Sequence, residues 1–352
     1  MRKRTVHIVG QSHIDLAWLW PYYPETIYDC CRLTFMRATD NLERDPEYVF
    51  AQDQVPLYKS VEENFPDLFE KIRKHVRDGS WSIVGGMFVE AEGGEPCGES
   101  LVRQCVMGQN YFRDKFGERA RVGWLPDNWT HPWQLPQILK KSGVDYLVFR
   151  RGAKGKALFW WTSPDGSSVL ACRPEVLSFR ARPFPDLDSL ASRLEEEYGV
   201  TNMLVLVGSG DHGGGPTYQE LQNIKDVSAL VEPQLIIRFS RPSDFFNEVE
   251  REASELRKFQ EELDFELVGD LINCHELKKG NRENEESLLA AEKFCLLASS
   301  LGLLDYPQGE LKDLWERLLF SQFHDIIGGS AIPSVQEETL KAYRRIDGKA
   351  KE

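Results

Sequence analysis

Long apolar stretches are absent from this 352-residue sequence. No segment approaches the roughly 20 apolar residues that a membrane-spanning helix requires, so we expect no association with a membrane. The basic residues at positions 2–4 precede an apolar segment of residues 5–9, which is too short to form the core of a secretory signal. These absences predict a soluble protein of the cytoplasm.

A surplus of basic residues is absent as well. The sequence has 43 Lys and Arg against 56 Asp and Glu, which gives a formal net charge of −13 at pH 7. A protein that binds nucleic acid by neutralising phosphates requires a basic face, so this balance argues against DNA or RNA as a partner. We predict no nucleic-acid binding.

Cysteine pairs of the C-x-x-C type do not occur. The seven cysteines form an odd and scattered set, which suits neither a disulfide framework nor a cysteine-based zinc site. We predict reduced and mostly buried thiols at Cys30, Cys31, Cys97, Cys105, Cys172, Cys274 and Cys295.

The sequence does contain a regular alternation of strand and helix patterns. Short apolar runs typical of buried strands occur at residues 5–9, 49–51, 81–84, 121–125, 146–149, 169–171, 204–207 and 235–238. Amphipathic helical patterns lie between them at residues 57–78, 100–116, 133–142 and 185–197. This alternation predicts an α/β fold with a mainly parallel sheet or barrel, with the chemistry at the carboxyl ends of the strands.

The character of the sequence changes near residue 244. Amphipathic helical patterns at residues 245–263, 283–301 and 309–324 follow one another without intervening strands. We therefore predict two domains, a catalytic α/β domain over residues 1–243 and a helical bundle module over residues 244–352.

A histidine and a carboxylate follow the first strand. In an extended loop, residues i and i+2 point the same way, so His13 and Asp15 are placed to meet one metal ion. The alternative is that the two side chains are simply hydrogen-bonded loop residues. The position directly after a buried strand favours a metal-binding role for the two side chains.

A second carboxylate, Asp127, follows the strand at residues 121–125. It stands between Pro126 and Trp129, in a stiff frame. The alternative is that Asp127 caps the helix expected after Pro132, although Asn128 could take that role and leave Asp127 free for chemistry.

Two further segments carry candidate residues. Asp211 lies in a glycine-rich loop, residues 208–217, that matches neither of the common nucleotide-binding patterns. The loop suits a sugar pocket better, because glycines let the backbone approach a ligand closely. The alternative is a flexible turn.

His324 and Asp325 end a helix rich in Leu and run into Gly-Gly-Ser. The alternative for His324 is a core histidine, but the abrupt stop of the helix favours a site.

Together these segments resemble glycoside hydrolase family 38, the α-mannosidases. Matching stretches occur in family order over nearly the whole chain, at residues 10–18 (GQSHIDLAW), 98–104 (GESLVRQ), 123–127 (GWLPD), 210–217 (GDHGGGPT), 281–285 (NRENE) and 322–326 (QFHDI). The resemblance implies a seven-stranded β/α barrel followed by a three-helix module. It also implies hydrolysis of α-mannosides with retention, through a covalent mannosyl-aspartate intermediate.

The resemblance further implies one zinc ion per chain, with cobalt or another divalent ion as an alternative. Its implied ligands are His13, Asp15, Asp127 and His324, a set of two His and two Asp that zinc accepts. Asp127 would also be the nucleophile. Asp211 is the candidate general acid, with Glu92 and Asp325 as alternatives.

The residues implied in substrate binding are Asp325, Arg150, Arg151, Trp18 and Trp129. The sequence departs from the family around the nucleophile, where it has Asp-Asn-Trp-Thr-His in place of the usual Asp-x-Phe-Gly or Asp-x-Phe-Gly-His. This departure bears on substrate preference more than on metal binding. The acidic segment after Val89 also reads Glu-Ala-Glu-Gly-Gly, where an Asp is more usual.

Family members are usually longer and carry β-sandwich domains after the helical module. We therefore expect either a minimal or split enzyme, for which a partner subunit or a homo-oligomer supplies what those domains provide, or a fragment. Two alternatives to the mannosidase stay open at this point. One is a zinc-dependent carbohydrate deacetylase, and the other is a non-catalytic sugar-binding subunit of a split mannosidase.

Overall fold

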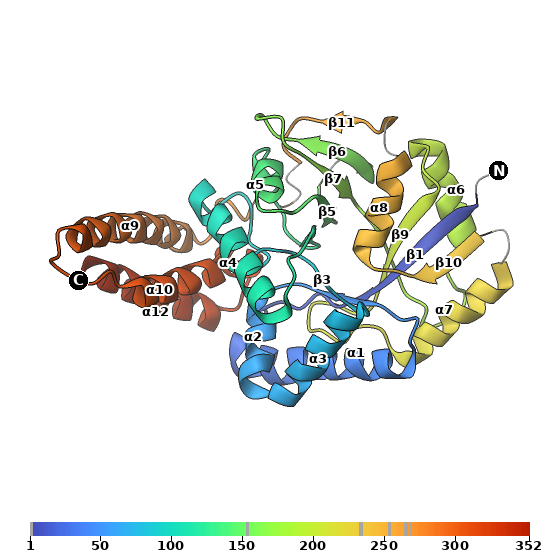
Figure 1. Ribbon diagram of the computed structural model, residues 1–352, viewed down its shortest axis with the longest axis horizontal. Helices are drawn as coiled ribbons and strands as arrows, with labels where there is room; N and C mark the ends of the chain where they lie inside the picture. Colours follow the sequence, from blue (N-terminus) through green and yellow to red (C-terminus); the bar gives the residue numbers. More distant parts are fainter. Residues whose placement is uncertain (1–2, 153–154, 232–234, 253–254, 264–266, 268) are drawn as a thin grey trace.

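The computed structural model describes residues 3–152, 155–231, 235–252, 255–263, 267 and 269–352. Its strands form two sheets surrounded by helices, and a group of long helices extends from one side (Figure 1). The α/β class with mainly parallel strands is confirmed.

The first sheet is built around β1, whose last six residues are buried. Its order is β3-β2-β1-β9-β8, with β10 also pairing with β1, and every pair is parallel. Continuous apolar runs, as in β1 and β9, are typical of parallel strands covered on both faces. The bounds are β1 (Arg4–Gln11), β2 (Phe50–Gln52), β3 (Trp81–Ile83), β8 (Glu175–Leu177), β9 (Asn202–Val207) and β10 (Leu235–Phe239).

The second sheet has the order β11-β6-β7-β5-β4 and is parallel except between β6 and β7. Its bounds are β4 (Val122–Leu125), β5 (Tyr146–Phe149), β6 (Leu158–Thr162), β7 (Ser168–Cys172) and β11 (Lys258–Phe259). The eight predicted strands all occur, whereas β6, β8 and β11 were not predicted.

The two sheets share one apolar interior. Side chains such as Val9 and Leu206 of the first sheet pack in the same buried cluster as Val148 and Leu170 of the second. The amide N–H of Gly85 donates to the carbonyl of Val122 (2.8 Å), so the β3 edge lies against β4. No ladder joins the two sheets within the described residues, and a single closed seven-stranded barrel stays a prediction.

Helices cover the sheets. Their bounds are η1 (Tyr22–Cys31), a π-helix, α1 (Arg32–Arg44), α2 (Val55–Asn64), α3 (Pro66–Asp78), α4 (Gly98–Phe116), α5 (Leu135–Lys141), α6 (Leu187–Tyr198), α7 (Tyr218–Val231) and α8 (Pro242–Glu252). The single helix predicted at residues 57–78 is wrong. Pro66 lacks an amide hydrogen and disfavours helical backbone at Phe65, so α2 ends and α3 begins there.

The helix predicted at residues 245–263 is wrong in its second half. α8 ends at Glu252 and packs against β1 and β9, and β11 pairs in parallel with β6. The pairing is supported by the Phe259 ring, which packs on Phe159 at 5.5 Å. These contacts place residues 242–252 and 258–259 with the sheets, and we therefore propose that the helical module begins with α9 rather than at residue 244.

The long helices α9 (His275–Ser300), α10 (Gln308–Ser321) and α12 (Pro333–Lys351) lie side by side at one end of the molecule (Figure 1). The one-turn helix α11 (His324–Ile327) connects α10 to α12 at the base of this group. None of the described helices combines the length and the apolarity needed to cross a bilayer. All seven cysteines are free thiols, and four of them are buried.

Candidate active site

The candidate site lies where the loops after β1 and β9 meet. The amide of Asp15 donates to the carbonyl of Asp211 (2.9 Å), and Ile14 forms an isolated bridge with His212. These contacts hold the His13–Asp15 segment against the glycine-rich loop. The carboxyl ends of two adjacent parallel strands therefore position a histidine and carboxylates at one edge of the sheet.

His324 reaches the same place from the helical module. α10 ends at Ser321, and His324 begins the separate one-turn helix α11, so the prediction that His324 and Asp325 end the preceding helix is wrong. The amide of His324 donates to the carbonyl of Glu90 (3.2 Å), and that of Glu92 donates to the carbonyl of Gln322 (3.0 Å). These two hydrogen bonds fix His324 against the loop that follows β3.

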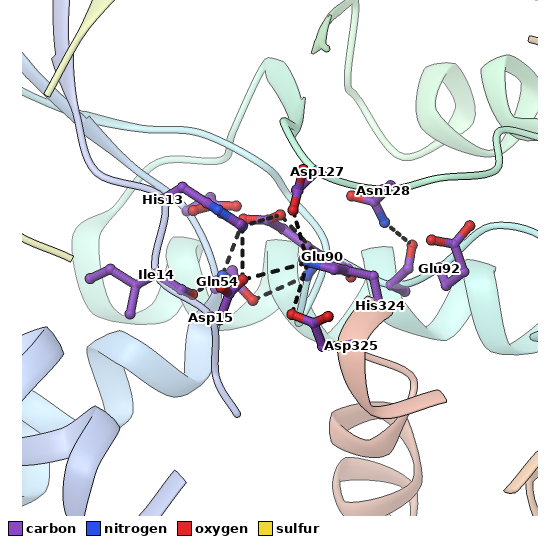
Figure 2. A network of polar contacts seen from close by, with 12 residues as sticks. His13, Ile14, Asp15, Gln54, Glu90, Glu92, Asp127, Asn128, His324 and Asp325 are labelled. Atoms are coloured by element: carbon purple, nitrogen blue, oxygen red, sulfur yellow. Dashed lines mark hydrogen bonds and ion pairs between the residues drawn. The ribbon is translucent and has the colours of Figure 1, made fainter. Parts of the chain in front are cut away.

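Three of the four predicted metal ligands converge. The ligand atoms of His13, Asp15 and His324 lie within 4.8 Å of one another, and all three residues are buried. Oδ1 of Asp15 lies 3.3 Å from Nε2 of His13 and 3.5 Å from Nε2 of His324. The two imidazole rings stack with their centroids 5.6 Å apart (Figure 2).

These atoms fit a metal ion because they are buried without hydrogen-bond partners. Nε2 of His13, Oδ1 of Asp15, Oε2 of Glu90 and Nε2 of His324 are all in this state. A buried polar atom that lacks a hydrogen-bond partner lowers the stability of the fold by about 1–3 kcal/mol, so a group of such atoms that face one another requires an explanation. Imidazole nitrogens and carboxylate oxygens are zinc ligands, and a zinc ion would satisfy all of them together.

Asp127, the fourth predicted ligand, lies at the rim of this group. Its Oδ2 is 3.9 Å from Nε2 of His324, while Nε of Arg151 donates to its Oδ1 at 2.6 Å. Asp127 follows β4, and its side chain is 21% exposed. The arginine occupies one carboxylate oxygen and leaves the other facing His324 (Figure 2).

Glu90 is the residue that sequence reasoning missed. Its Oε2 lies 3.2 Å from Nε2 of His13 and 3.8 Å from Nδ1 of His324. Its Oε1 accepts a hydrogen bond from Nε2 of Gln54 at 3.1 Å, which orients the carboxylate toward the two imidazoles. The available signal was an acidic side chain in the loop after a predicted strand, the same signal that identified Asp127.

The carboxylates determine the protonation of both histidines. Burial alone would lower the pKa of His13, but the charges of Glu90 and Asp15 raise it well above its usual value. Burial likewise opposes the charge on His324, but the nearby carboxylates of Asp15 and Asp325 raise its pKa to about 9. Without a metal the two imidazoles are therefore expected to carry protons, which a divalent ion would displace.

The predicted general acid lines a pocket together with the predicted nucleophile. A cavity of about 170 Å³ is bordered by His13, Asp127, Arg150 and Asp211. Asp211 has 62% of its side chain exposed and lies 3.3 Å from Nδ1 of His13. A hydrogen bond with His13 and the charges of His13, Arg150 and Arg151 lower the pKa of Asp211, which is opposite to the direction that a general acid requires.

The two alternative acids are less accessible than Asp211. Asp325 is 4% exposed, its Oδ2 lies 3.7 Å from Nε2 of His324, and burial raises its pKa to about 6. Glu92 is fully buried and accepts hydrogen bonds from the backbone amides of Trp129 (2.9 Å) and Thr130 (2.7 Å). Glu92 thus holds the segment after Asp127 in place and does not face the pocket.

The remaining predicted substrate contacts differ in their surroundings. Arg150 is exposed at the pocket rim, and Arg151 contacts Asp127. Trp129 is 7% exposed, and its ring packs edge-on against His324 at 6.1 Å, so it has little face to offer a sugar. Trp18 is half-buried and packs against Trp20 at 5.9 Å.

His131 lies outside the site, in agreement with a structural role. It is fully buried between Phe149 and Trp161, at ring distances of 6.1 and 6.4 Å. Burial lowers its pKa to about 4. The folded protein therefore keeps this imidazole neutral at pH values where the unfolded chain, with a pKa of about 6.5, takes up a proton.

This burial predicts an acid-dependent loss of stability that His131→Phe removes. As the pH falls from about 6.5 to about 4, His131 is expected to lower the free energy of unfolding by about 1.4 kcal/mol per pH unit. Urea unfolding of the zinc-free protein across this range measures the slope. His275→Gln, which changes a histidine with 77% of its side chain exposed, is the control and should keep the wild-type slope. Equal slopes for wild type and His131→Phe would contradict the assignment.

A parallel α/β core with a His-Asp cluster at its strand ends is typical of metal-dependent hydrolases. Residues 3–264 match the glycosyl hydrolases family 38 N-terminal domain, and residues 274–352 match the alpha mannosidase middle domain. The chain belongs to glycosyl hydrolase family 38.

Two curated relatives and one solved structure are similar to this chain. Alpha-mannosidase 2C1 of Homo sapiens is 34% identical over 98% of this chain and 34% of its own length. Alpha-mannosidase G of Dictyostelium discoideum is 32% identical over 97% of this chain and 32% of its own length. An alpha-mannosidase from Enterococcus faecalis V583 shares the fold, with a TM-score of 0.84, 21% identity and coverage of 99% of this chain and 41% of its own. The chain thus spans about a third of the length of these curated relatives.

Proposed function

We propose that this chain forms the catalytic part of a zinc-dependent retaining α-mannosidase. The observation that carries the proposal is that ligand atoms of His13, Asp15 and His324 converge and are buried without hydrogen-bond partners among the described residues. Asp127, which accepts a hydrogen bond from Arg151, lies beside them. Family membership supports the substrate class, because the curated relatives are named α-mannosidases. We infer that the two sheets make up the barrel that the resemblance implies, and that α9, α10 and α12 make up its three-helix module.

The residues that would hold zinc are His13, Asp15, Asp127 and His324, with Glu90 close enough to join them or to orient the imidazoles. Bound there, zinc would act as a Lewis acid toward sugar hydroxyls and would stabilise negative charge that develops on them.

Asp127 would act as the nucleophile. Arg151 donates to Oδ1 of Asp127 and so orients the carboxylate, one oxygen of which would attack the anomeric carbon. As the new carbon–oxygen bond forms, the glycosidic bond breaks and the leaving oxygen takes a proton. Water then cleaves the mannosyl-aspartate, which releases mannose with its original α configuration.

Asp211 would give that proton to the leaving oxygen and later accept one from water. Its position supports this role, because it lines the same pocket as Asp127 and is accessible from solvent. Asp325 is closer to His324 than to the open pocket and would bind sugar hydroxyls or orient that histidine. A bound sugar that excludes water from Asp211 would raise its pKa toward the protonated form.

We expect the zinc-loaded chain to hydrolyse an aryl α-mannoside and to release α-mannose first. Proton NMR of the early product distinguishes the anomers, and metal analysis of the same sample gives the zinc content. The control is the chelator-treated protein, which should be inactive and should recover with zinc. Release of β-mannose would contradict retention. Acetate release from an acetylated sugar without mannoside cleavage would favour the deacetylase, and sugar-dependent stabilisation without any turnover would favour the sugar-binding subunit.

We also propose a cytoplasmic location and a partner that covers the active-site pocket. The pocket is open to solvent at Asp211 and Arg150, and the usual β-domains of the family would cover such a face. A partner subunit or a second copy of the chain would have the same effect.

A further inference from the structure

A second buried group of carboxylates lies near the active site and is not used by the proposed mechanism. Oxygen atoms of Glu92, Glu95 and Asp270 lie within 4.8 Å of one another. The three residues are 0%, 8% and 4% exposed. Glu92 and Glu95 belong to the segment between β3 and α4, whereas Asp270 precedes α9, so the group joins the α/β part to the helical module.

Within the part of the chain that the structure describes, the carboxylates of Glu95 and Asp270 accept no hydrogen bond. All four of their oxygen atoms are buried and lack a partner there. Burial raises the pKa of Glu95 to about 8, and burial also raises the pKa of Asp270. Two adjacent carboxylates without donors are unfavourable in a buried position unless a proton or a cation neutralises them.

The nearest basic side chains are engaged elsewhere. Nζ of Lys278 donates to Oδ1 of Asn273 (2.7 Å) and to the carbonyl of Ile327 (2.8 Å). Arg282 donates to the backbone carbonyl of Glu95 (3.2 Å) rather than to its carboxylate. The charge of Lys278 acts on both carboxylates and opposes the rise in their pKa, but neither basic side chain is seen to donate a hydrogen bond to them within the described residues.

The segment that carries the two glutamates is closely packed against the active-site loop. Glu92 accepts the amides of Trp129 and Thr130, two and three residues after Asp127. A Cβ added to Gly94 would lie 2.7 Å from Oγ1 of Thr130 and 3.1 Å from Cδ2 of Leu271, which leaves no room for a larger residue. The carboxylates are thus held on a fixed frame.

We propose that Glu92, Glu95 and Asp270 bind a second divalent cation, separate from the zinc site. The group offers only carboxylate oxygens, which suit calcium, magnesium or manganese and not zinc. Through Glu92 the cation would connect the segment before α9 to the backbone that follows Asp127. This inference does not depend on the proposed mannosidase activity, because it rests on a different set of residues.

The test uses the full chain, stripped of metal and then loaded with one equivalent of zinc. Titration calorimetry with calcium chloride is expected to show one binding event per chain, and calcium is expected to raise the melting temperature saturably. Glu95→Gln and Asp270→Asn should each weaken calcium binding at least tenfold while leaving the zinc content unchanged. Glu283→Gln, an exposed carboxylate on α9, is the matched control and should bind calcium as wild type does.

Three results would overturn the proposal. The first is that calcium, magnesium and manganese each fail to bind or to change the melting temperature of the zinc-loaded wild type, which would mean that the carboxylates hold a proton instead. The second is unchanged calcium binding in the Glu95→Gln and Asp270→Asn double variant. The third is loss of calcium binding in His324→Ala, which would assign the calcium to the zinc site. If one single variant does not fold, the other gives the same answer.

Discussion

Asp127→Asn is expected to reduce turnover of an aryl α-mannoside by roughly a thousandfold or more. The amide cannot attack the anomeric carbon, yet it has the shape of the carboxylate and its oxygen can still accept a hydrogen bond from Arg151. The fold should therefore persist while the first chemical step fails. Steady-state rates at saturating substrate, measured with zinc in excess, give the loss in kcat directly.

The structure provides a control for this variant. Asp165 is paired with Lys141 on the surface, far along the chain from the site, so Asp165→Asn should keep wild-type turnover. Asp127→Ala with added azide separates a missing nucleophile from a damaged site, because azide attacking from the same face should form β-mannosyl azide. If Asp127→Asn with full zinc content turned over substrate within tenfold of the wild-type rate, the assignment of Asp127 as the nucleophile would be contradicted.

Sequence reasoning singled out side chains that directly follow a strand, and the structure brings these side chains close together. His13, Asp127 and Asp211 come after β1, β4 and β9, and all three line one pocket. His324 was harder to place because it comes from a helix far along the chain. Only the resemblance to the family connected it to the N-terminal pair, and no local pattern could have done so.

Glu90 was missed because its loop does not follow the simple alternation of an extended segment. The amide of Ala91 donates to the carbonyl of Val89 (2.9 Å), which turns the chain at Glu90. As a result Glu90 faces His13, while Glu92, two residues later, faces the amides of Trp129 and Thr130. In an extended segment the two side chains would point the same way.

Two of the three unpredicted strands share a different cause. β11 and β8 are two and three residues long and partly exposed, so their apolar signal is weak. They form strands because a neighbouring strand offers a free edge, as β6 does for β11 and β9 for β8. Tertiary pairing of this kind leaves little trace in local sequence.

His324→Ala is expected to abolish stable zinc binding. Removal of a direct ligand should weaken zinc affinity beyond the roughly 10–100-fold that the loss of a second-shell partner costs. Zinc at about a thousand times its dissociation constant stabilises a folded protein by about 4 kcal/mol, and the variant should lose this gain. Thermal unfolding with and without zinc, together with metal analysis, measures both effects.

The buried location of His324 makes a matched control necessary, because loss of any core imidazole could destabilise the protein. His131 is equally buried, but it is not one of the residues grouped with His13, Asp15 and His324, so His131→Phe should keep full zinc content.

The pH dependence of zinc binding gives a second test. Zinc binds the neutral imidazole, whereas the pKa of His324 is about 9 in the metal-free protein. Zinc binding by the wild type should therefore release protons near pH 7 and should tighten as the pH rises toward 9. Stoichiometric zinc in His324→Ala, or wild-type binding that does not change between pH 6.5 and 9, would show that the two imidazoles and Asp15 converge for a reason other than a metal.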